Sequence, residues 1–322
     1  MDKPLVSVII CCYNQRETVA RAIDSVLMQR CDFPFEIIIG DDASTDGTAD
    51  ICRGYRERCP GQVKLVDRPE NLGLVPNYFD GVRRARGTYI ADCAGDDFWL
   101  GEERLQHLVD ALRRHPSAAM ACGLHADYDP EKDTLTPAAP PDGTPCFDEK
   151  DFGRALAARF LSRRLRPDIV LSAALYRKDL LDRYFTEGPE RFLDGRYPAE
   201  DISVTAALLM QGPVCFLPEI NLAYRLQAES VNHSADPLKY LRFCRRTFVQ
   251  TLEWAEYLNI EAEDLQPWLS EKIRWYVDLA FRSGSLEEAV RLRRACRRYG
   301  RRLPWGSALK CFLLHLPFFR AA

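Results

Sequence analysis

Two hydrophobic periods alternate along the first 112 residues, and this alternation constrains the fold more than any other feature of the sequence. Continuous runs rich in β-branched and apolar residues are typical of strands buried on both faces. They occupy residues 6–12, 35–41, 63–67 and 88–93. Apolar residues at helical spacing fill the intervals between these runs. The pattern predicts an α/β fold with a doubly wound, mostly parallel sheet, in which ligands bind beyond the carboxyl ends of the strands.

The rest of the chain divides into a second part of the sheet and a helical region. Two further strands are predicted at 168–177 and 214–225, and the five prolines of residues 129–147 predict a loop. Farther on the apolar spacing is helical, over 238–258, 268–281 and 286–299. We therefore predict an α/β domain over residues 1–230 and a helical C-terminal appendage over residues 231–322.

Composition excludes several classes of protein. The 12 cysteines are scattered without a Cys-x-x-Cys pair, which argues against a zinc knuckle or a redox site and favours a reducing compartment. The N-terminus lacks the pattern of a signal peptide, and no stretch reaches the roughly 20 apolar residues that span a bilayer. We expect a cytoplasmic protein that is soluble or attached to a membrane surface.

Charge is distributed unevenly along the chain. The net charge is −3, but residues 291–322 carry eight arginines and one lysine without an acidic residue, so the remaining residues sum to −12. A basic segment beside apolar residues is typical of peripheral attachment to an anionic membrane. The alternative is that the apolar residues of this segment pack onto the helical region or onto a second subunit. These residues are Trp305, Leu309, Phe312, Leu313 and Leu316. The sequence does not decide between these two hypotheses. A homodimer is also possible, since the second hypothesis includes packing onto a second subunit.

Polar segments follow three of the predicted strands. They are CCYN at 11–14, GDDAST at 40–45 and GDDFW at 95–99. A single acidic pair would most simply cap a helix or fold a turn. Two pairs at the ends of parallel strands converge on one crevice, where a cation would relieve their repulsion. Since Mg²⁺ binds through one or two carboxylates together with substrate phosphates, the arrangement predicts a divalent metal and a phosphorylated ligand.

A glycine-rich phosphate loop is absent from the first half of the sequence. Neither G-x-G-x-x-G nor G-x-x-x-x-G-K-[ST] occurs there, which argues against a dehydrogenase or a P-loop nucleotidase. The diphosphate of a nucleotide would then be held by a metal. This favours an enzyme that uses a nucleoside diphosphate as the leaving group.

Five motifs follow one another along residues 4–234. They are VSVIICCYN (6–14), EIIIGDDASTDGT (36–48), the segment from ENLG to GDDFW (70–99), AED (199–201) and YRLQAESVNHS (224–234). Their order and spacing resemble the nucleotide-sugar domain of family 2 glycosyltransferases. The resemblance implies the Rossmann-like GT-A fold for this part of the chain. The residues after 234 match no motif of that family.

The resemblance implies a role for each matching position. Cys11, Tyr13 and Asn14 would line the nucleobase pocket, and Asp42 would accept a hydrogen bond from the base. Asp96 would lie near the ribose and diphosphate. Arg225 would bind the phosphates or bridge the acidic residues. Asp97 would ligate Mn²⁺ or Mg²⁺, and Asp201 would be the general base that takes the acceptor's proton. Glu200 and Asp201 precede an apolar helix, so a capping role is also open to either residue.

The activity implied by the resemblance is an inverting, metal-dependent glycosyl transfer. The donor would be a nucleoside diphosphate sugar, expected to be UDP-linked, and the acceptor a hydroxyl of a saccharide or lipid-linked molecule in polysaccharide or glycolipid assembly. Such a core gives nucleic acid no role, and a membrane contact would place the protein on the inner face. The alternative is a non-catalytic nucleotide-sugar-binding module, because Ala94 stands where the family often carries an acid. The presence of Asp201 argues against this alternative.

Overall fold

A computed structural model describes residues 3–138, 148–188, 190–193, 195–226, 237–298, 303 and 305–315. The chain forms two compact units. The first comprises Met1–Ala157 and Leu165–Leu226, and the second comprises Ala158–Arg164 and Gln227–Ala322. The two units are described separately.

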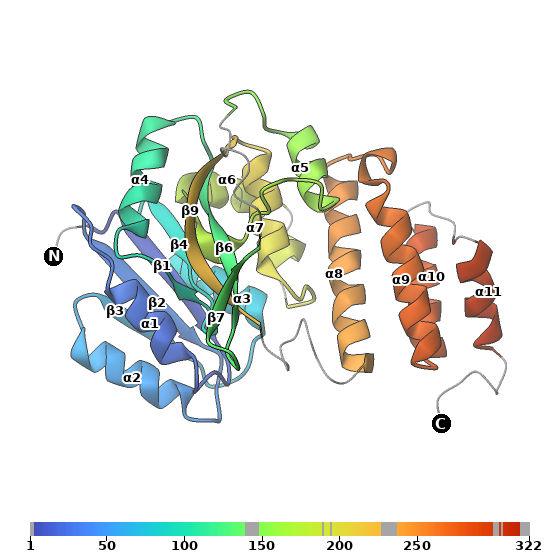
Figure 1. The fold of residues 1–322 in the computed structure, drawn as a ribbon, viewed down its shortest axis with the longest axis horizontal. Helices are drawn as coiled ribbons and strands as arrows, with labels where there is room; N and C mark the ends of the chain where they lie inside the picture. The colour runs from blue at the N-terminus through green and yellow to red at the C-terminus, as the bar shows by residue number, and fades with distance from the viewer. Residues whose placement is uncertain are drawn as a thin grey trace. The chain divides into compact units, whose positions relative to one another are not determined.

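The first unit is built on one curled sheet (Figure 1). Its strands lie in the order β3 (Val63–Asp67), β2 (Phe35–Asp41), β1 (Val6–Cys12), β4 (Tyr89–Asp92), β8 (Ala174–Arg177), β6 (Met120–Asp129), β9 (Val214–Arg225) and β5 (Phe98–Trp99), and β7 (Thr134–Pro137) pairs with β6. The pairings make six of these described strands run in one direction, with β5, β7 and β8 opposed to them. The predicted α/β fold with a mostly parallel sheet is therefore confirmed.

Helices cover both faces of the parallel part of the sheet. They are α1 (Val19–Leu27), α2 (Thr48–Arg58), α3 (Leu74–Arg84) and α4 (Arg104–Arg114). Cys12 of β1 lies 3.9 Å from Cys52 of α2, measured between the sulfur atoms, whereas Ile9 of β1 lies against Gly81 of α3. Residues 9 and 12 of a strand point to opposite faces, so α2 and α3 lie on opposite sides of β1. This is the doubly wound arrangement.

Two sequence predictions differ from the structure. The segment 168–177 was expected to be one strand, but its middle forms a 3₁₀ turn (Leu171–Ala173) and only Ala174–Arg177 is strand β8. The proline-rich segment 129–147 was expected to be a loop, but Thr134–Pro137 pairs with Tyr128 and its neighbours as β7. The tight turn between β6 and β7 allows this hairpin in spite of the prolines. Residues 139–147 lie outside the described residues.

Strand β6 has no strong sequence signal of its own. Its first half, Met-Ala-Cys-Gly, contains small residues without β-branching, yet it is buried between β8 and β9. Gly123 lies there against Asn221 of β9, whose side chain would overlap a Cβ at position 123. Helices α5 (Arg154–Leu161), α6 (Lys178–Glu187) and α7 (Glu200–Leu209), with the short turn Glu190–Leu193, complete the described elements up to β9.

The second unit is helical, as the apolar spacing predicts. It contains α8 (Pro237–Tyr257), α9 (Trp268–Arg282), α10 (Leu286–Arg298) and α11 (Trp305–Leu313), with a 3₁₀ turn at Glu263–Leu265. Helix α9 packs against the other three, around buried Phe248, Trp254 and Val277. A buried carboxylate, Glu288, accepts a 2.6 Å hydrogen bond from Nε of Arg245. Among the described helices, none is long and apolar enough to cross a membrane.

Candidate active site

The polar segments predicted to converge do meet at the carboxyl ends of the parallel strands. Strand β1 lies between β2 and β4, with Cys12 opposite Asp41 and Ile9 opposite Asp92. The chain after β4 turns back toward β1, where the N–H of Gly95 donates a 3.3 Å hydrogen bond to the carbonyl of Cys11. The register of three parallel strands thus brings the segments 11–14, 40–45 and 95–99 to one edge of the sheet.

The loop after β1 is fastened to the loop after β2. Asn14 has a positive φ of 52°, a conformation that Asn tolerates better than most residues. Its main-chain N–H donates to Oγ of Ser44 at 2.9 Å, and its side-chain Oδ1 accepts from the N–H of Thr45 at 2.8 Å. Beside it, the ring of Tyr13 is 48% exposed. The Tyr13 ring therefore presents a flat aromatic surface to solvent on a loop that hydrogen bonds to Ser44 and Thr45 keep in place.

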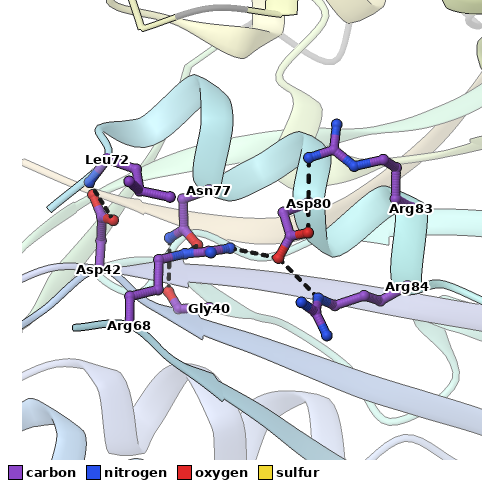
Figure 2. A network of polar contacts seen from close by, with 8 residues as sticks. All are labelled: Gly40, Asp42, Arg68, Leu72, Asn77, Asp80, Arg83 and Arg84. Atoms are coloured by element: carbon purple, nitrogen blue, oxygen red, sulfur yellow. Dashed lines mark hydrogen bonds and ion pairs between the residues drawn. The ribbon is translucent and has the colours of Figure 1, made fainter. Parts of the chain in front are cut away.

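Asp42 is buried and anchors the next loop. Its Oδ1 accepts from the N–H of Leu72 at 2.9 Å (Figure 2), and its Oδ2 accepts from the N–H of Gly73 at 2.8 Å. Each carboxylate oxygen has about two lone-pair sites, so each retains room for a further donor. Burial raises the pKa of the Cys11 thiol on β1, and the carboxylates of Glu200, Asp92 and Asp42 raise it further.

An arginine that the sequence analysis did not select lies beside Asp42. Nε of Arg68 donates to Oδ1 of Asn77 at 2.8 Å, and Nη2 donates to Oδ2 of Asp80 at 2.7 Å (Figure 2). Asn77 in turn donates from Nδ2 to the carbonyl of Gly40 at 2.8 Å. Because a Cβ at Gly40 would come within 2.4 Å of the Asn77 Oδ1, this position requires glycine. The network holds Arg68 with 11% of its side chain exposed.

The acidic pair after β4 lies in a desolvated place. Burial and the neighbouring carboxylate of Asp96 together raise the pKa of Asp97 to about 8, against the opposing effects of the Arg225 N–H and the Ser172 hydroxyl. Burial also raises the pKa of Asp96. The main-chain N–H of Asp96, the charge of Arg225 and the side chain of Gln15 each lower this pKa, but by less. Two acids that resist ionisation side by side form a site that favours a cation.

Arg225 joins the end of β9 to this acidic pair. Its main-chain N–H donates a 3.0 Å hydrogen bond to Oδ1 of Asp97, and its guanidinium lies 5.2 Å from the centre of the Tyr128 ring. The Arg225 Nε and Oε1 of Gln15 are buried polar atoms without a hydrogen-bond partner among the described residues. Buried polar atoms of this kind need an explanation, and an absent ligand is one.

A second arginine extends the same surface. The guanidinium of Arg21, on α1, lies 3.5 Å from the centre of the Phe98 ring and 4.8 Å from that of Tyr128. Arg21, Gln15, Arg68 and Ser172 were not found from the sequence, because they stand outside the acidic motifs. Their places depend on packing between elements that are far apart along the chain.

Asp96 and Asp97 fit a metal that takes few ligands from the protein. No group of three or more potential metal-binding side chains occurs in the part of the chain that the structure describes. Two adjacent carboxylates, of which Asp97 is buried and Asp96 half-buried, suit Mg²⁺ or Mn²⁺ when substrate phosphates supply further oxygens. The residues present therefore fit a metal that arrives together with a phosphorylated ligand.

The predicted base lies in the first turn of α7. The N-cap position is Ala199, whose side chain makes no capping bond, so neither acid takes the cap itself. Oδ1 of Asp201 accepts a 2.7 Å hydrogen bond from the N–H of Ile202. Burial, together with a smaller effect of the Asp201 carboxylate, raises the pKa of Glu200 to about 8. Glu200 is therefore largely protonated at neutral pH, a state in which it cannot accept a proton.

The sequence matches one family over most of this unit. The profile of glycosyl transferase family 2 matches residues 7–185, which is more than half of the chain. This chain belongs to glycosyl transferase family 2. Among curated relatives of this family 2 member, the putative teichuronic acid biosynthesis glycosyltransferase TuaG of Bacillus subtilis is 41% identical over 112 residues, covering 35% of this chain and 44% of TuaG. The matched segments span between 28% and 44% of the length of such relatives.

Solved structures share the fold of this family 2 member at low sequence identity. TarS of S. aureus, in complex with UDP-GlcNAc, superposes with a TM-score of 0.56 at 17% identity, covering 92% of each chain. The mannosyltransferase PcManGT of Pyrobaculum calidifontis, in complex with GDP-Man and Mn²⁺, superposes with a TM-score of 0.54 at 19% identity. That match covers 98% of this chain and 85% of PcManGT. The predicted GT-A fold is confirmed by these likenesses.

Proposed function

We propose that this chain is an inverting glycosyltransferase that moves a sugar from a nucleoside diphosphate to an acceptor hydroxyl. The donor in this proposal is a UDP-linked sugar. The observation that carries the proposal is the meeting of Asp97 with Arg225 at the carboxyl edge of the sheet. It sets buried carboxylates for a cation beside a guanidinium with an unpartnered Nε. Membership of family 2, and the sugar nucleotides bound to TarS and PcManGT, support the same assignment.

The nucleoside would bind on the side of β1 and β2. The exposed ring of Tyr13 offers a surface for the base, and Cys11 and Asn14 would line the pocket through their main chain. Asp42 retains acceptor capacity for an N–H of the base edge, which uracil provides. Arg68, held by Asn77 and Asp80, adds a donor for a base carbonyl or a phosphate. These assignments are part of the proposal.

The diphosphate would bind at the acidic pair. Asp97 would ligate Mn²⁺ or Mg²⁺, with Asp96 turned toward the ribose and the diphosphate. The metal, when bound, would neutralise the charge that develops on the leaving diphosphate. Arg225 would donate to the phosphate oxygens from its guanidinium, which Tyr128 holds by stacking. Charge-assisted hydrogen bonds of this kind strengthen as the leaving group gains charge.

Asp201 would act as the general base. The acceptor hydroxyl attacks the anomeric carbon as its proton passes to Asp201, a new carbon–oxygen bond forms, and the bond to the diphosphate oxygen breaks. Attack from the side opposite the leaving group inverts the anomeric configuration. The raised pKa of Glu200 favours Asp201 over Glu200 for this role in our proposal. A positioned base contributes about 10²–10⁴-fold to the rate.

The acceptor would be a saccharide or a lipid-linked molecule. The relative TuaG is named for teichuronic acid biosynthesis, and we propose polysaccharide or glycolipid assembly for this chain. A cytoplasmic location on the inner face of the membrane would give access both to soluble donors and to lipid-linked acceptors.

A panel of sugar nucleotides tests the proposal. The protein is incubated with UDP-, GDP- and dTDP-linked sugars, with Mn²⁺, with Mg²⁺ or with excess chelator, and released nucleoside diphosphate is measured. We expect slow, metal-dependent hydrolysis of at least one donor, with UDP-linked donors preferred. Tight binding of a donor without turnover, even when saccharide acceptors are added, would favour the non-catalytic binding module instead.

A further inference from the structure

Helix α11 of the second unit has two faces of opposite character. Ser307, Cys311 and Leu314 are buried, because this side of the helix packs on α9 and α10. On the other side, Trp305 is 83% exposed, Leu309 is 42% exposed and Phe312 is 62% exposed. Internal packing, one of the two hypotheses from the sequence, is therefore wrong for these three residues within the second unit. Leu316 lies outside the described residues.

The exposed apolar residues form one stripe. At about 100° per residue, positions 305, 309 and 312 fall within about 60° of one another around the helix axis. The buried positions 307, 311 and 314 lie on the opposite side. We call Trp305, Leu309 and Phe312 the apolar stripe. The packing of α11 on α9 already orders the helix, so burial of the stripe would require no further ordering of the backbone.

Exposed arginines accompany the stripe on the neighbouring helix. Helix α10 pairs Arg291 with Glu287 and Arg298 with Glu253. Its other arginines, Arg293, Arg294 and Arg297, are exposed and form no ion pair with any residue that the structure describes. Their positions fall within about 100° around the axis of α10, away from its buried Leu292 and Cys296. We call these three residues the arginine cluster.

One member of the arginine cluster, Arg293, lies near the buried side of α11. Burial raises the pKa of the Cys311 thiol on α11, and the guanidinium of Arg293 opposes this shift, which places the charge near that helix. The contacts between α10 and α11 agree with this placement. An apolar stripe and unpaired positive charge therefore stand on adjacent helices of one compact unit.

We propose that the apolar stripe of α11 and the arginine cluster of α10 form a docking surface for an anionic membrane. In this arrangement the stripe is buried at the boundary of headgroups and acyl chains, and the guanidinium groups contact lipid phosphates. An aromatic ring at each end of the stripe suits this boundary, where Trp is enriched in membrane proteins.

The size of the stripe favours lipid over a protein partner. Three side chains of this kind bury roughly 500 Å² together, below the roughly 800 Å² that each partner contributes to a standard protein interface. A bilayer has no such minimum, because apolar insertion and electrostatic attraction act together on a small surface. The unpaired arginines give the surface the charge that complements an anionic leaflet.

Co-sedimentation with vesicles tests the docking surface on the full chain. We expect binding to phosphatidylglycerol-containing vesicles at low ionic strength, weaker binding at high ionic strength, and little binding to pure phosphatidylcholine vesicles. Trp305→Ser, Leu309→Ser and Phe312→Ser combined should reduce the partition coefficient at least tenfold. Arg293→Gln, Arg294→Gln and Arg297→Gln should reduce it about fivefold each, the fold-change that corresponds to about 1 kcal/mol.

Matched controls separate the docking surface from general charge and apolarity. Leu135→Ser removes an apolar side chain that is 45% exposed on β7, and Arg56→Gln, Lys150→Gln and Arg154→Gln remove the same charge from other exposed sites. Both controls should bind vesicles like the wild type. Quenching of tryptophan fluorescence by brominated phosphatidylglycerol should weaken in Trp305→Phe, a variant that keeps an apolar ring.

Three outcomes would overturn the proposal. The wild type could ignore anionic vesicles at low ionic strength. The stripe variant could bind them as the wild type does while retaining its circular dichroism spectrum. The stripe substitutions could instead convert an oligomer to a monomer in sedimentation analysis, which would identify the stripe as a contact between copies of this chain.

Discussion

The main-chain N–H of Arg225 donates a 3.0 Å hydrogen bond to Oδ1 of Asp97, and so ties the end of β9 to the acidic pair after β4. The guanidinium of Arg225 is near enough to Asp96 and Asp97 for its charge to oppose the rise in both pKa values, and its Nε has no hydrogen-bond partner among the described residues. A cation and a diphosphate would complete this arrangement, since the cation satisfies the acids and the phosphates satisfy the arginine.

Arg225→Gln tests the phosphate contact. We expect the affinity for nucleoside diphosphates to fall about 10-fold to 100-fold, because a charge-assisted hydrogen bond is lost and the acids lose a neighbouring positive charge. Titration calorimetry with UDP and with uridine measures the effect. Uridine lacks the phosphates, so its affinity should stay the same, and an equal loss for both ligands would show that Arg225 acts on the nucleoside pocket.

Asp201→Asn tests the general base. We expect kcat to fall by about 10² or more while donor affinity stays nearly unchanged, because only proton removal in the transition state is lost. Glu200→Gln is the matched control, since it replaces an acid that is largely protonated at neutral pH by a neutral side chain of the same shape. If Glu200→Gln abolishes turnover and Asp201→Asn does not, the two roles are reversed.

Gly40→Ala tests the network that holds Arg68. The added methyl would meet Oδ1 of Asn77 at 2.4 Å, so the Asn77 side chain must leave its bonds to Arg68 and to the Gly40 carbonyl. We expect a loss of about 1–3 kcal/mol in unfolding free energy, measured by chemical denaturation. The same substitution at Gly54 of α2 meets nothing within 4 Å and should stabilise the helix slightly. Equal effects at both positions would contradict the steric argument.

Asp92→Asn tests a buried acid next to the site. Oδ2 of Asp92 accepts a 2.8 Å hydrogen bond from the Tyr176 hydroxyl, and burial raises the pKa of Asp92 to about 7. An unfolded Asp has a pKa near 3.9, so the folded protein prefers the protonated acid. The stabilisation that this preference provides is complete below about pH 4 and is lost as the pH rises to about 7.

Asparagine cannot lose a proton, so the stability of the variant should increase relative to that of the wild type as the pH rises. We expect the difference in unfolding free energy to move by about 2–3 kcal/mol in favour of Asp92→Asn between about pH 5 and about pH 8.5. Thermal unfolding at both pH values measures this. A difference that is independent of pH would mean that Asp92 is ionised in the folded protein at both.

The sequence predicted the parallel part of the sheet well, because its strands are buried on both faces and carry β-branched runs. The bounds of 6–12, 35–41 and 63–67 agree with β1, β2 and β3. It did not predict β6, whose Ala, Cys and Gly have weak strand preference and are placed by contacts with β8 and β9. Propensity alone could not identify a strand that tertiary packing selects.

The candidate site shows the same division. The segments that carry Cys11, Asp42 and Asp97 could be placed together because they end adjacent parallel strands. Arg68 and Ser172 could not be assigned to the site from the sequence, because nothing in their local sequence indicates a functional residue. Arg68 reaches it through Asn77 on α3, and Ser172 through a 3₁₀ turn that replaces part of a predicted strand.

We propose that Asp97 holds a divalent metal that this chain requires to transfer a sugar from its nucleotide donor. The most direct test is the rate of nucleoside diphosphate release from the most active donor, with Mn²⁺ present, for the wild type and for Asp97→Ala. We expect the wild-type rate to disappear in excess chelator and to return with added Mn²⁺, and the rate of Asp97→Ala to be lower by 10²-fold or more at every Mn²⁺ concentration. Wild-type release that persists in excess chelator, or an Asp97→Ala variant as fast as the wild type, would contradict it.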